Sequence, residues 1–265
     1  MAKLIDSMVA TLKSLPRFDD RNILVTGATD GIGRALSLAL GKRGATVILL
    51  GRREAALAEI YDQIIQAGGA TPAIIPCDLA TLTSGQAQEL AQHLEDELGR
   101  LDGLAHLAGV LGGREPIQSH RPTQWNLALQ VNLNSAFYLT QAFLPLLEIS
   151  SAGRIVFATS SVGTRIEAYW GAYAVSKAGL EMFAGILSQE LENTSNTRVF
   201  TVNPGGTRTK MRLEAMPGEN PSTLPSPEMV SDAFLYGLTE QAGEYSGLQV
   251  NARDLMYALG TWTAL

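Results

Sequence analysis

The chain has 265 residues, of which 46% are hydrophobic and 17% charged, and its formal net charge is −6 at pH 7. This composition argues against a disordered chain, and the acidic balance argues against a general nucleic-acid binder, whose affinity depends on basic residues that neutralise phosphates. No apolar run reaches the roughly 18–20 residues of a membrane-spanning helix, so we expect neither a nucleic-acid nor a membrane partner. Cys77 is the only cysteine, which excludes an internal disulfide and favours a cytoplasmic protein.

Residues 1–20 are predicted to be an N-terminal helical extension. Their apolar side chains follow helical spacing at Leu4, Ile5, Met8, Val9, Leu12 and Leu15. We expect a short amphipathic helix that ends at Pro16 and docks on the body of the protein or on a partner subunit. The segment lacks the apolar core of a signal peptide, and its few lysines make a helix on a membrane surface the weaker interpretation.

From residue 22 onward, predicted strands alternate with predicted helices. Short apolar runs predict strands at 22–26, 47–50, 73–77, 101–107, 154–159, 198–202 and 248–250. Helical patterns lie between them at about 33–40, 55–67, 86–98, 125–147 and 170–192, and Pro145 favours a bend in the fourth. Buried strands joined by helices imply a parallel sheet that is covered on both faces. We therefore predict a single α/β domain of the doubly wound, Rossmann-like class over residues 21–265.

A proline-rich segment interrupts this pattern near the end of the chain. Residues 208–227 contain Pro217, Pro221 and Pro225 and end at Pro227, among Gly, Ser and Asn residues. Long excursions of this kind in a compact domain often cover a ligand site. We interpret the segment as a lid within the single domain.

The first predicted strand is followed directly by a glycine-rich turn and a helix. The turn reads Thr26-Gly-Ala-Thr-Asp-Gly-Ile-Gly33. Glycines let the backbone approach a pyrophosphate closely, and the helix N-terminus supplies N–H donors. A plain turn is the alternative, but the strand-turn-helix context favours a dinucleotide site. Its predicted contacts are Gly27, Thr29, Asp30, Gly31, Ile32 and Gly33.

The end of the second strand indicates which dinucleotide is bound. An acidic residue is expected about 20 residues after the glycine motif when the ligand has a free ribose 2′-hydroxyl, but that region contains Gly51 followed by Arg52 and Arg53. Guanidinium groups favour a 2′-phosphate, so we predict NADP(H) in preference to NAD(H). Alternatively, Arg52 is a solvated residue at a helix start. Asp78 closes the third strand and either binds the adenine amino group or forms a turn.

Tyr173 and Lys177 lie four residues apart and share one face of the predicted helix 170–192. A free tyrosine has a pKa of about 10 and exchanges protons poorly at neutral pH. A nearby ammonium group can lower that pKa by roughly 1–3 units. The pair is therefore a candidate acid/base group, although two unrelated surface residues could share this spacing.

These motifs together resemble the short-chain dehydrogenase/reductase family over nearly the whole chain beyond residue 20. The resemblance rests on Thr26-Gly-x-x-x-Gly-x-Gly33, Asp78, Ala108-Gly109, Asn132, Ser160, Tyr173-x-x-x-Lys177 and Asn203-Pro-Gly-Gly-Thr-Arg-Thr209. Runs at 156–163, 170–173 and 203–209 are similar to those of its YciK-like bacterial oxidoreductases. The resemblance implies a seven-stranded parallel sheet in the order 3-2-1-4-5-6-7.

The resemblance also implies roles for individual residues. Tyr173 would be the general acid/base, Lys177 would lower its pKa and hold the nicotinamide ribose, and Ser160 would polarise the substrate carbonyl, with Ser161 as an alternative. Asn132 would bend its helix and hold a water in a proton relay. Implied cofactor contacts, besides the glycine-rich turn and the two arginines, are Asp78, Leu79, Ala108, Gly109, Pro204, Gly205, Thr207 and Thr209.

The expected activity is hydride transfer between NADP(H) and a carbonyl compound or secondary alcohol. The expected substrate walls are largely apolar, which favours a hydrophobic small molecule; they comprise Leu111, Val162, Tyr169, Trp170 and the segment from Met211 to Leu224. One alternative is a cofactor-binding regulatory or scaffold protein without turnover, although all four catalytic positions are occupied. Another is a sugar-nucleotide epimerase or dehydratase, whose glycines are usually spaced differently.

One motif departs from the family pattern. His106-Leu107 stands where Asn-Asn is common, and since the missing asparagine usually ties neighbouring strands together, we expect some loss of stability. His106 is expected to be a structural histidine at the end of a buried strand, and His93 and His120 to lie on a helix surface and in a loop. No cluster has metal-ligand spacing. The family often assembles through the helices that start near Trp125 and Trp170, so a homodimer or homotetramer is expected.

Overall fold

The computed structural model describes residues 1–14 and 16–262. Leu15, the last apolar position of the predicted N-terminal helix, lies outside the described residues.

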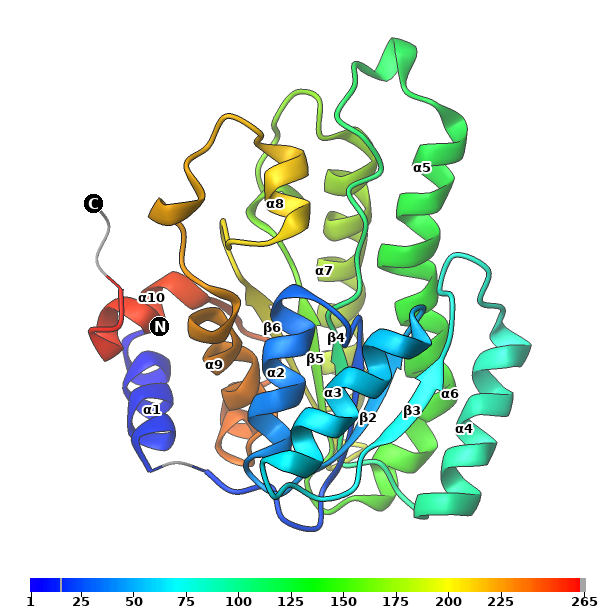
Figure 1. Cartoon of the computed structure of the whole chain (residues 1–265), viewed down its shortest axis with the longest axis vertical. Helices are drawn as coiled ribbons and strands as arrows, with labels where there is room; N and C mark the ends of the chain where they lie inside the picture. The colour runs from blue at the N-terminus through cyan, green and yellow to red at the C-terminus, as the bar shows by residue number, and fades with distance from the viewer. Residues whose placement is uncertain (15, 263–265) are drawn as a thin grey trace.

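A seven-stranded sheet forms the centre of the molecule (Figure 1). Its order is β3-β2-β1-β4-β5-β6-β7 and every neighbouring pair is parallel, which confirms the predicted fold class and strand order. The strands are β1 (Asn22–Thr26), β2 (Thr46–Gly51), β3 (Ala73–Pro76), β4 (Gly103–His106), β5 (Arg154–Ala158), β6 (Arg198–Asn203) and β7 (Gln249–Asn251).

Helices cover both faces of this sheet. They are α1 (Ala2–Lys13), α2 (Gly31–Gly41), α3 (Glu54–Gln66), α4 (Ser84–Leu98), α5 (Pro122–Leu129), α6 (Ser135–Ile149), α7 (Gly171–Leu191), α8 (Lys210–Ala215), α9 (Pro227–Gly237) and α10 (Ala252–Leu259). Side chains alternate between the faces of a strand, so Ile23 and Val25 pack with α2, α3 and α9, whereas Leu24 packs with α4, α6 and α7. Two separate cores result, and both are apolar because neither face of the sheet meets water.

The predicted long helix 125–147 is divided by a π-helical turn, η2 (Gln130–Asn134), between α5 and α6. Asn132 lies in this turn, while Pro145 lies inside α6, which continues to Ile149. The helical geometry is thus interrupted at Asn132, where the resemblance implied a bend, and the bend expected near Pro145 stays a prediction. Insertions of this kind widen one turn of a helix and are frequent at functional sites.

Helix α1 docks on the body of the molecule, beside α10 and α9 (Figure 1). Leu4, Met8 and Leu12 are buried there, and the Ser7 hydroxyl lies 3.0 Å from the Tyr236 hydroxyl of α9. The apolar face predicted from the sequence is thus covered by the same chain. None of the helices in residues 1–14 and 16–262 is long and apolar enough to cross a membrane.

Candidate active site

A cavity of about 700 Å³ opens at the carboxyl ends of the central strands. The strand order reverses between β1 and β4, and ligands of open α/β sheets bind at such a reversal. The cavity lies beside the turn after β1, the loop after β4, helix α7 and the start of α8. Predicted site residues that line it are Gly27, Thr29, Asp30, Gly31, Ile32, Gly33, Arg52, Arg53, Asp78, Leu79, Ala108, Gly109, Leu111, Tyr173, Lys177, Pro204, Thr209 and Met211.

The glycine-rich turn has the close packing that its sequence predicts. Gly27 has a φ of +69°, and a Cβ there would lie 2.9 Å from the Cα of Ala108. A Cβ on Gly33 would meet the carbonyl oxygen of Gly27. Asp30 begins α2, since its carboxylate accepts a hydrogen bond from the backbone N–H of Gly31 (2.8 Å). The result is a side-chain-free surface at a helix N-terminus, which fits a pyrophosphate.

Thr26 connects the two loops at the strand reversal. Its hydroxyl oxygen accepts hydrogen bonds from the backbone N–H groups of Leu107 and Ala108, each at 3.1 Å. It also donates to the carbonyl oxygen of Ala105 (3.4 Å). A threonine at the end of β1 thus connects this strand to β4 and to the loop that follows β4.

Arg52 and Arg53 line the cavity at the end of β2, and their side chains differ in their hydrogen bonds and ion pairs. The Arg53 guanidinium donates to the carbonyl oxygen of Thr29 (3.3 Å) and lies 3.9 Å from the Asp30 carboxylate. Arg52 is exposed and, among the described residues, has no ion pair. Asp78 accepts from the backbone N–H of Ala80 (3.0 Å), so it does form a turn while it lines the cavity.

Lys177 is buried and lies one turn after Tyr173 on α7. Its ammonium nitrogen donates to the carbonyl oxygen of Ala158 at the end of β5 (2.7 Å) and lies 5.7 Å from the centroid of the Tyr173 ring. Burial lowers the pKa of Lys177 to about 8, although the Glu181 carboxylate acts in the opposite direction. The lysine is thus fixed by the sheet and also faces the cavity.

The pKa of Tyr173 departs from the sequence-based expectation. Burial of the phenol raises its pKa to about 12, and a hydrogen bond with the Ser160 side chain lowers it only in part. The predicted lowering by Lys177 is therefore not what this structure gives, because the cost of burying a phenolate outweighs the neighbouring polar groups. Ser160 and Tyr173 are nevertheless brought together, as their predicted partnership requires.

Asn132 lies behind the cavity and is almost fully buried. Its side-chain oxygen accepts from the backbone N–H of Val110 (2.8 Å), and its amide donates to the carbonyl oxygen of Val110 and to the Ser176 hydroxyl (both 2.9 Å). These bonds connect the loop after β4 to helix α7. Through these contacts Asn132 holds the loop after β4 and helix α7 in place on the two sides of the cavity.

His106 is a buried structural histidine, as predicted. Its Nε2 atom lies 3.0 Å from the Thr140 hydroxyl, and its ring stacks on Phe157 with centroids 4.8 Å apart. Burial and the charge of Lys177 lower the pKa of His106 to about 3. The ring is consequently neutral at physiological pH.

The expected substrate walls form a small apolar cluster next to Tyr173. Buried Leu111, Val162, Trp170 and Ala215 pack there with Met211. Tyr169 differs, because 57% of it is exposed and its φ is +72°. Seven predicted residues are not in the cavity lining: Asn132, Ser160, Val162, Tyr169, Trp170, Gly205 and Thr207.

Some lining residues were missed by sequence reasoning. Lys210 lines the cavity and its ammonium lies 2.8 Å from the Asp30 carboxylate, which joins α8 to the glycine-rich turn. Its position next to Thr209, a predicted contact, was the only available signal. Cys77 and Thr159 also line the cavity, each next to a predicted site residue, and Gln124 lines it without any signal in its local sequence.

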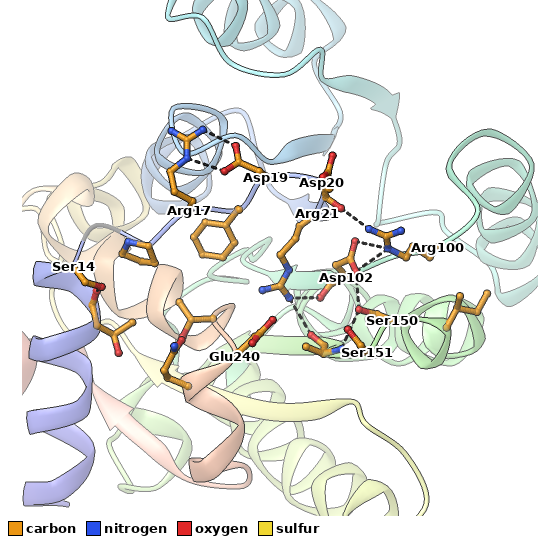
Figure 2. A pocket seen from close by; sticks show the side chains of 17 residues that line it. Ser14, Arg17, Asp19, Asp20, Arg21, Arg100, Asp102, Ser150, Ser151 and Glu240 are labelled. Atoms are coloured by element: carbon orange, nitrogen blue, oxygen red, sulfur yellow. Dashed lines mark hydrogen bonds and ion pairs between the residues drawn. The ribbon is translucent and has the colours of Figure 1, made fainter.

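A second cavity of about 700 Å³ lies at the opposite ends of the central strands, where β1, β4 and β5 begin (Figure 2). The Arg21 guanidinium donates there to the carbonyl oxygens of Leu238, Asp102 and Ala152, and the Asp102 carboxylate accepts from Arg100 and Ser150. The buried charged groups of this cavity are thus satisfied by the protein itself, which indicates a structural role. Among the described residues no group of His, Cys, Asp and Glu could hold a metal ion.

Known proteins share this arrangement. The family model for short chain dehydrogenases matches residues 21–220. The chain belongs to the short chain dehydrogenase family. It is 43% identical over 235 residues to the uncharacterized oxidoreductase YciK of Escherichia coli K12, covering 89% of this chain and 92% of YciK.

Solved structures of similar family members agree with the fold described above. An E. coli yciK oxidoreductase has a TM-score of 0.87 and 42% identity, covering 90% of this chain and 97% of the other. A protein of E. coli CFT073, described as a short chain dehydrogenase and solved in complex with NADPH, has the same TM-score and identity, covering 90% and 99%. The resemblance to YciK-like oxidoreductases is therefore confirmed.

Proposed function

We propose that this short chain dehydrogenase interconverts a carbonyl compound and a secondary alcohol by hydride transfer, with NADP(H) as cofactor. One observation carries the proposal: Tyr173 and Lys177 line the same cavity as the glycine-rich turn from Gly27 to Gly33. A dinucleotide whose pyrophosphate lies on that turn can extend toward the acid/base pair.

The chain's residues fit such a cofactor. Gly27 and Gly33 leave a surface that any side chain would fill, and Gly51 brings no carboxylate to the 2′ position of the ribose. Arg52, which is exposed and free of an ion pair among the described contacts, is the proposed partner of a 2′-phosphate. The complex of the similar E. coli CFT073 protein with NADPH supports NADP(H) over NAD(H).

When bound, the nicotinamide supplies or accepts the hydride. We propose that Ser160 donates a hydrogen bond to the substrate carbonyl oxygen and that Tyr173 gives that oxygen its proton during reduction. Lys177 holds positive charge beside the developing alkoxide and binds the ribose. Asn132 keeps the loop after β4 and helix α7 in register, and Pro204, Gly205, Thr207 and Thr209 contact the cofactor.

The lid proposal concerns residues 208–227. Helix α8 in this segment is joined to the glycine-rich turn by the Lys210–Asp30 ion pair, and it brings Met211 to the apolar cluster. We propose that the segment covers both cofactor and substrate, so that release requires this ion pair to open. The substrate itself is a small, largely apolar carbonyl compound or alcohol.

We further propose a homodimer or homotetramer built through α6 and α7. Phe137 is 41% exposed on α6, and Met182 and Ile186 are 66% and 49% exposed on α7. Phe137 and Phe183 lie edge to face across these helices, so aromatic side chains join α6 to α7 beside the exposed residues. Light scattering tests this proposal, and a strictly monomeric protein would refute it.

The test of function is an assay of NADPH oxidation with a panel of apolar aldehydes and ketones, and of NADP⁺ reduction with the corresponding alcohols. We expect turnover with NADPH that depends on Tyr173. Tight NADPH binding without turnover on any member of the panel would favour the regulatory or scaffold alternative.

A further inference from the structure

Arg114 is half-buried and places a positive charge against Trp170, a member of the apolar cluster beside Tyr173, just outside the lining of the cofactor cavity. It comes from the loop between β4 and α5, and its guanidinium carbon lies 4.6 Å from the centroid of the Trp170 ring. The same indole ring lies 5.9 Å from the Tyr173 ring. Trp170 therefore contacts both the guanidinium and the proposed acid/base group.

The donors of Arg114 are only partly used. Its Nη1 atom donates to the carbonyl oxygen of Ala215 and lies 3.3 Å from the sulfur of Met216, both at the end of α8. Its Nε atom is buried and has no hydrogen-bond partner among the described residues. A guanidinium has five N–H donors in a planar fork, so this side chain retains donor capacity.

Several charged side chains near this cluster are paired, although Glu214 of α8, which lines the cavity, has no ion pair among the described residues. Glu115, the next residue, lies 3.5 Å from Arg121. Glu167 pairs with Arg165 (2.8 Å), and Arg212 pairs with Glu219. Within residues 1–14 and 16–262, Arg114 has no carboxylate within ion-pair distance.

A cation placed among apolar side chains is unfavourable unless an anion accompanies it. The neighbouring residues do not provide that anion, although Glu115 is adjacent in the sequence. One unpaired guanidinium matches a single negative charge, and its fork geometry suits a carboxylate. A phosphate would require more positive charge than this end of the site offers.

We propose that Arg114 binds a carboxylate group of the substrate, so that the substrate is an apolar oxo acid or the matching hydroxy acid. This inference rests on the carbonyl–alcohol activity proposed above. Arg114 and Tyr173 would then hold the two ends of one molecule: the guanidinium binds the carboxylate, the apolar cluster encloses the chain, and Tyr173 meets the carbonyl. Because Arg114 also bonds to Ala215, substrate binding would stabilise the closed position of α8.

The test compares Arg114→Met, which keeps the length of the side chain and its contact with Trp170, with Arg114→Lys. The probes are keto acids of increasing chain length, each paired with its methyl ester, assayed with NADPH. Lys42→Met is the control, since it removes an exposed positive charge at the end of α2.

We expect the wild type to prefer each acid of suitable length over its ester. Arg114→Met should lower kcat/KM for the acid about 30- to 100-fold, mainly through KM, because a charge-assisted hydrogen bond is lost. The ester should change less than about threefold, Arg114→Lys should recover part of the loss, and Lys42→Met should resemble the wild type.

Two results would overturn the inference: no preference for acids over esters in the wild type, or an equal loss on acid and ester in Arg114→Met. The second would mean that Arg114 only holds α8. A binding measurement tests the carboxylate site even if the proposed reaction is wrong. It is calorimetry of the NADPH-loaded protein with a saturated carboxylic acid and with the corresponding amide. Carboxylate binding that Arg114→Met abolishes supports the site even where no turnover occurs, and equal binding of the two ligands contradicts it.

Discussion

The ammonium nitrogen of Lys177 donates to the carbonyl oxygen of Ala158, at 2.7 Å, while it stays 5.7 Å from the centre of the Tyr173 ring. The lysine is thereby anchored to the end of β5, beside the ring of Tyr173. Because this anchor is a backbone group, it positions any lysine here independently of the side chain of residue 158.

Replacement of Tyr173 by phenylalanine tests its proposed role as the acid/base group. Tyr173→Phe removes one hydroxyl and keeps the ring that packs on Trp170, so the fold should be retained. We expect at least a 100-fold loss of kcat, the usual contribution of a positioned proton donor, with NADPH affinity within about threefold of wild type in calorimetry. Tyr257→Phe, at an exposed position of α10, is the control, and retained activity in Tyr173→Phe would refute the assignment.

The carboxylate of Glu181 should raise the pKa of Lys177 and so oppose the effect of burial. Glu181 lies one turn further along α7, its carboxylate accepts from the Thr201 hydroxyl (3.3 Å), and its second oxygen is buried without a partner among the described residues. Its negative charge raises the pKa of Lys177, which burial lowers to about 8. The other titratable groups near this lysine are Tyr173 and the neutral His106.

Glu181→Gln removes that charge at nearly constant volume, so the pKa of Lys177 should fall further. If the reaction requires a protonated lysine, activity at high pH is lost at a lower pH than in the wild type. The measurement is kcat/KM against pH for both proteins, with Glu190→Gln on the exposed side of α7 as control. An alkaline limb that does not move would show that Glu181 has no influence on Lys177.

Arg52→Ala should discriminate between the two cofactors. A 2′-phosphate contact of this kind is a charge-assisted hydrogen bond, and its loss should weaken NADPH binding about 10- to 100-fold. NADH lacks the phosphate, so its affinity should change less than about twofold. Calorimetric titration of both cofactors checks this, with Lys42→Ala as a control for surface charge. Tighter binding of NADH than NADPH by the wild type would contradict the proposed preference.

His106 predicts a dependence of stability on pH. The pKa of its imidazole is about 3 in the folded protein against 6.5 when unperturbed, so below pH 6.5 the unfolded chain binds a proton that the folded one does not. Stability therefore falls as the pH drops from 6.5 toward 3, by about 1.4 kcal/mol per pH unit.

Urea unfolding at pH 7 and pH 5 measures this contribution, which should be about 2 kcal/mol between these two values. His106→Asn cannot titrate, so its loss of stability over the same interval should be smaller by that amount. Carboxylates that titrate nearby affect both proteins equally and cancel in the comparison. Equal losses in the two proteins would show that His106 is protonated within the fold.

The sequence by itself determined the doubly wound class and the location of the dinucleotide turn, while the order of the strands followed from the resemblance to the family. The first two features are local: buried parallel strands are continuous apolar runs such as Ile23–Val25, and the glycines of the turn are required where backbone meets backbone, as Gly27 meets Ala108. The pairing of Tyr173 with Lys177 could also be predicted from their spacing, because both lie on one helix.

Only the tertiary structure decided how these groups behave. The pKa of Tyr173 is raised and not lowered, because burial depends on segments far apart in the chain. The π-helical turn at Asn132, where the resemblance implied a bend, is fixed by hydrogen bonds to Val110, 22 positions away. In the same way, Thr26 connects β1 to the loop after β4, and among the described residues Arg114 has no counter-ion although Glu115 is its neighbour in sequence. Pairing and solvation are long-range properties, so no local pattern could have given them.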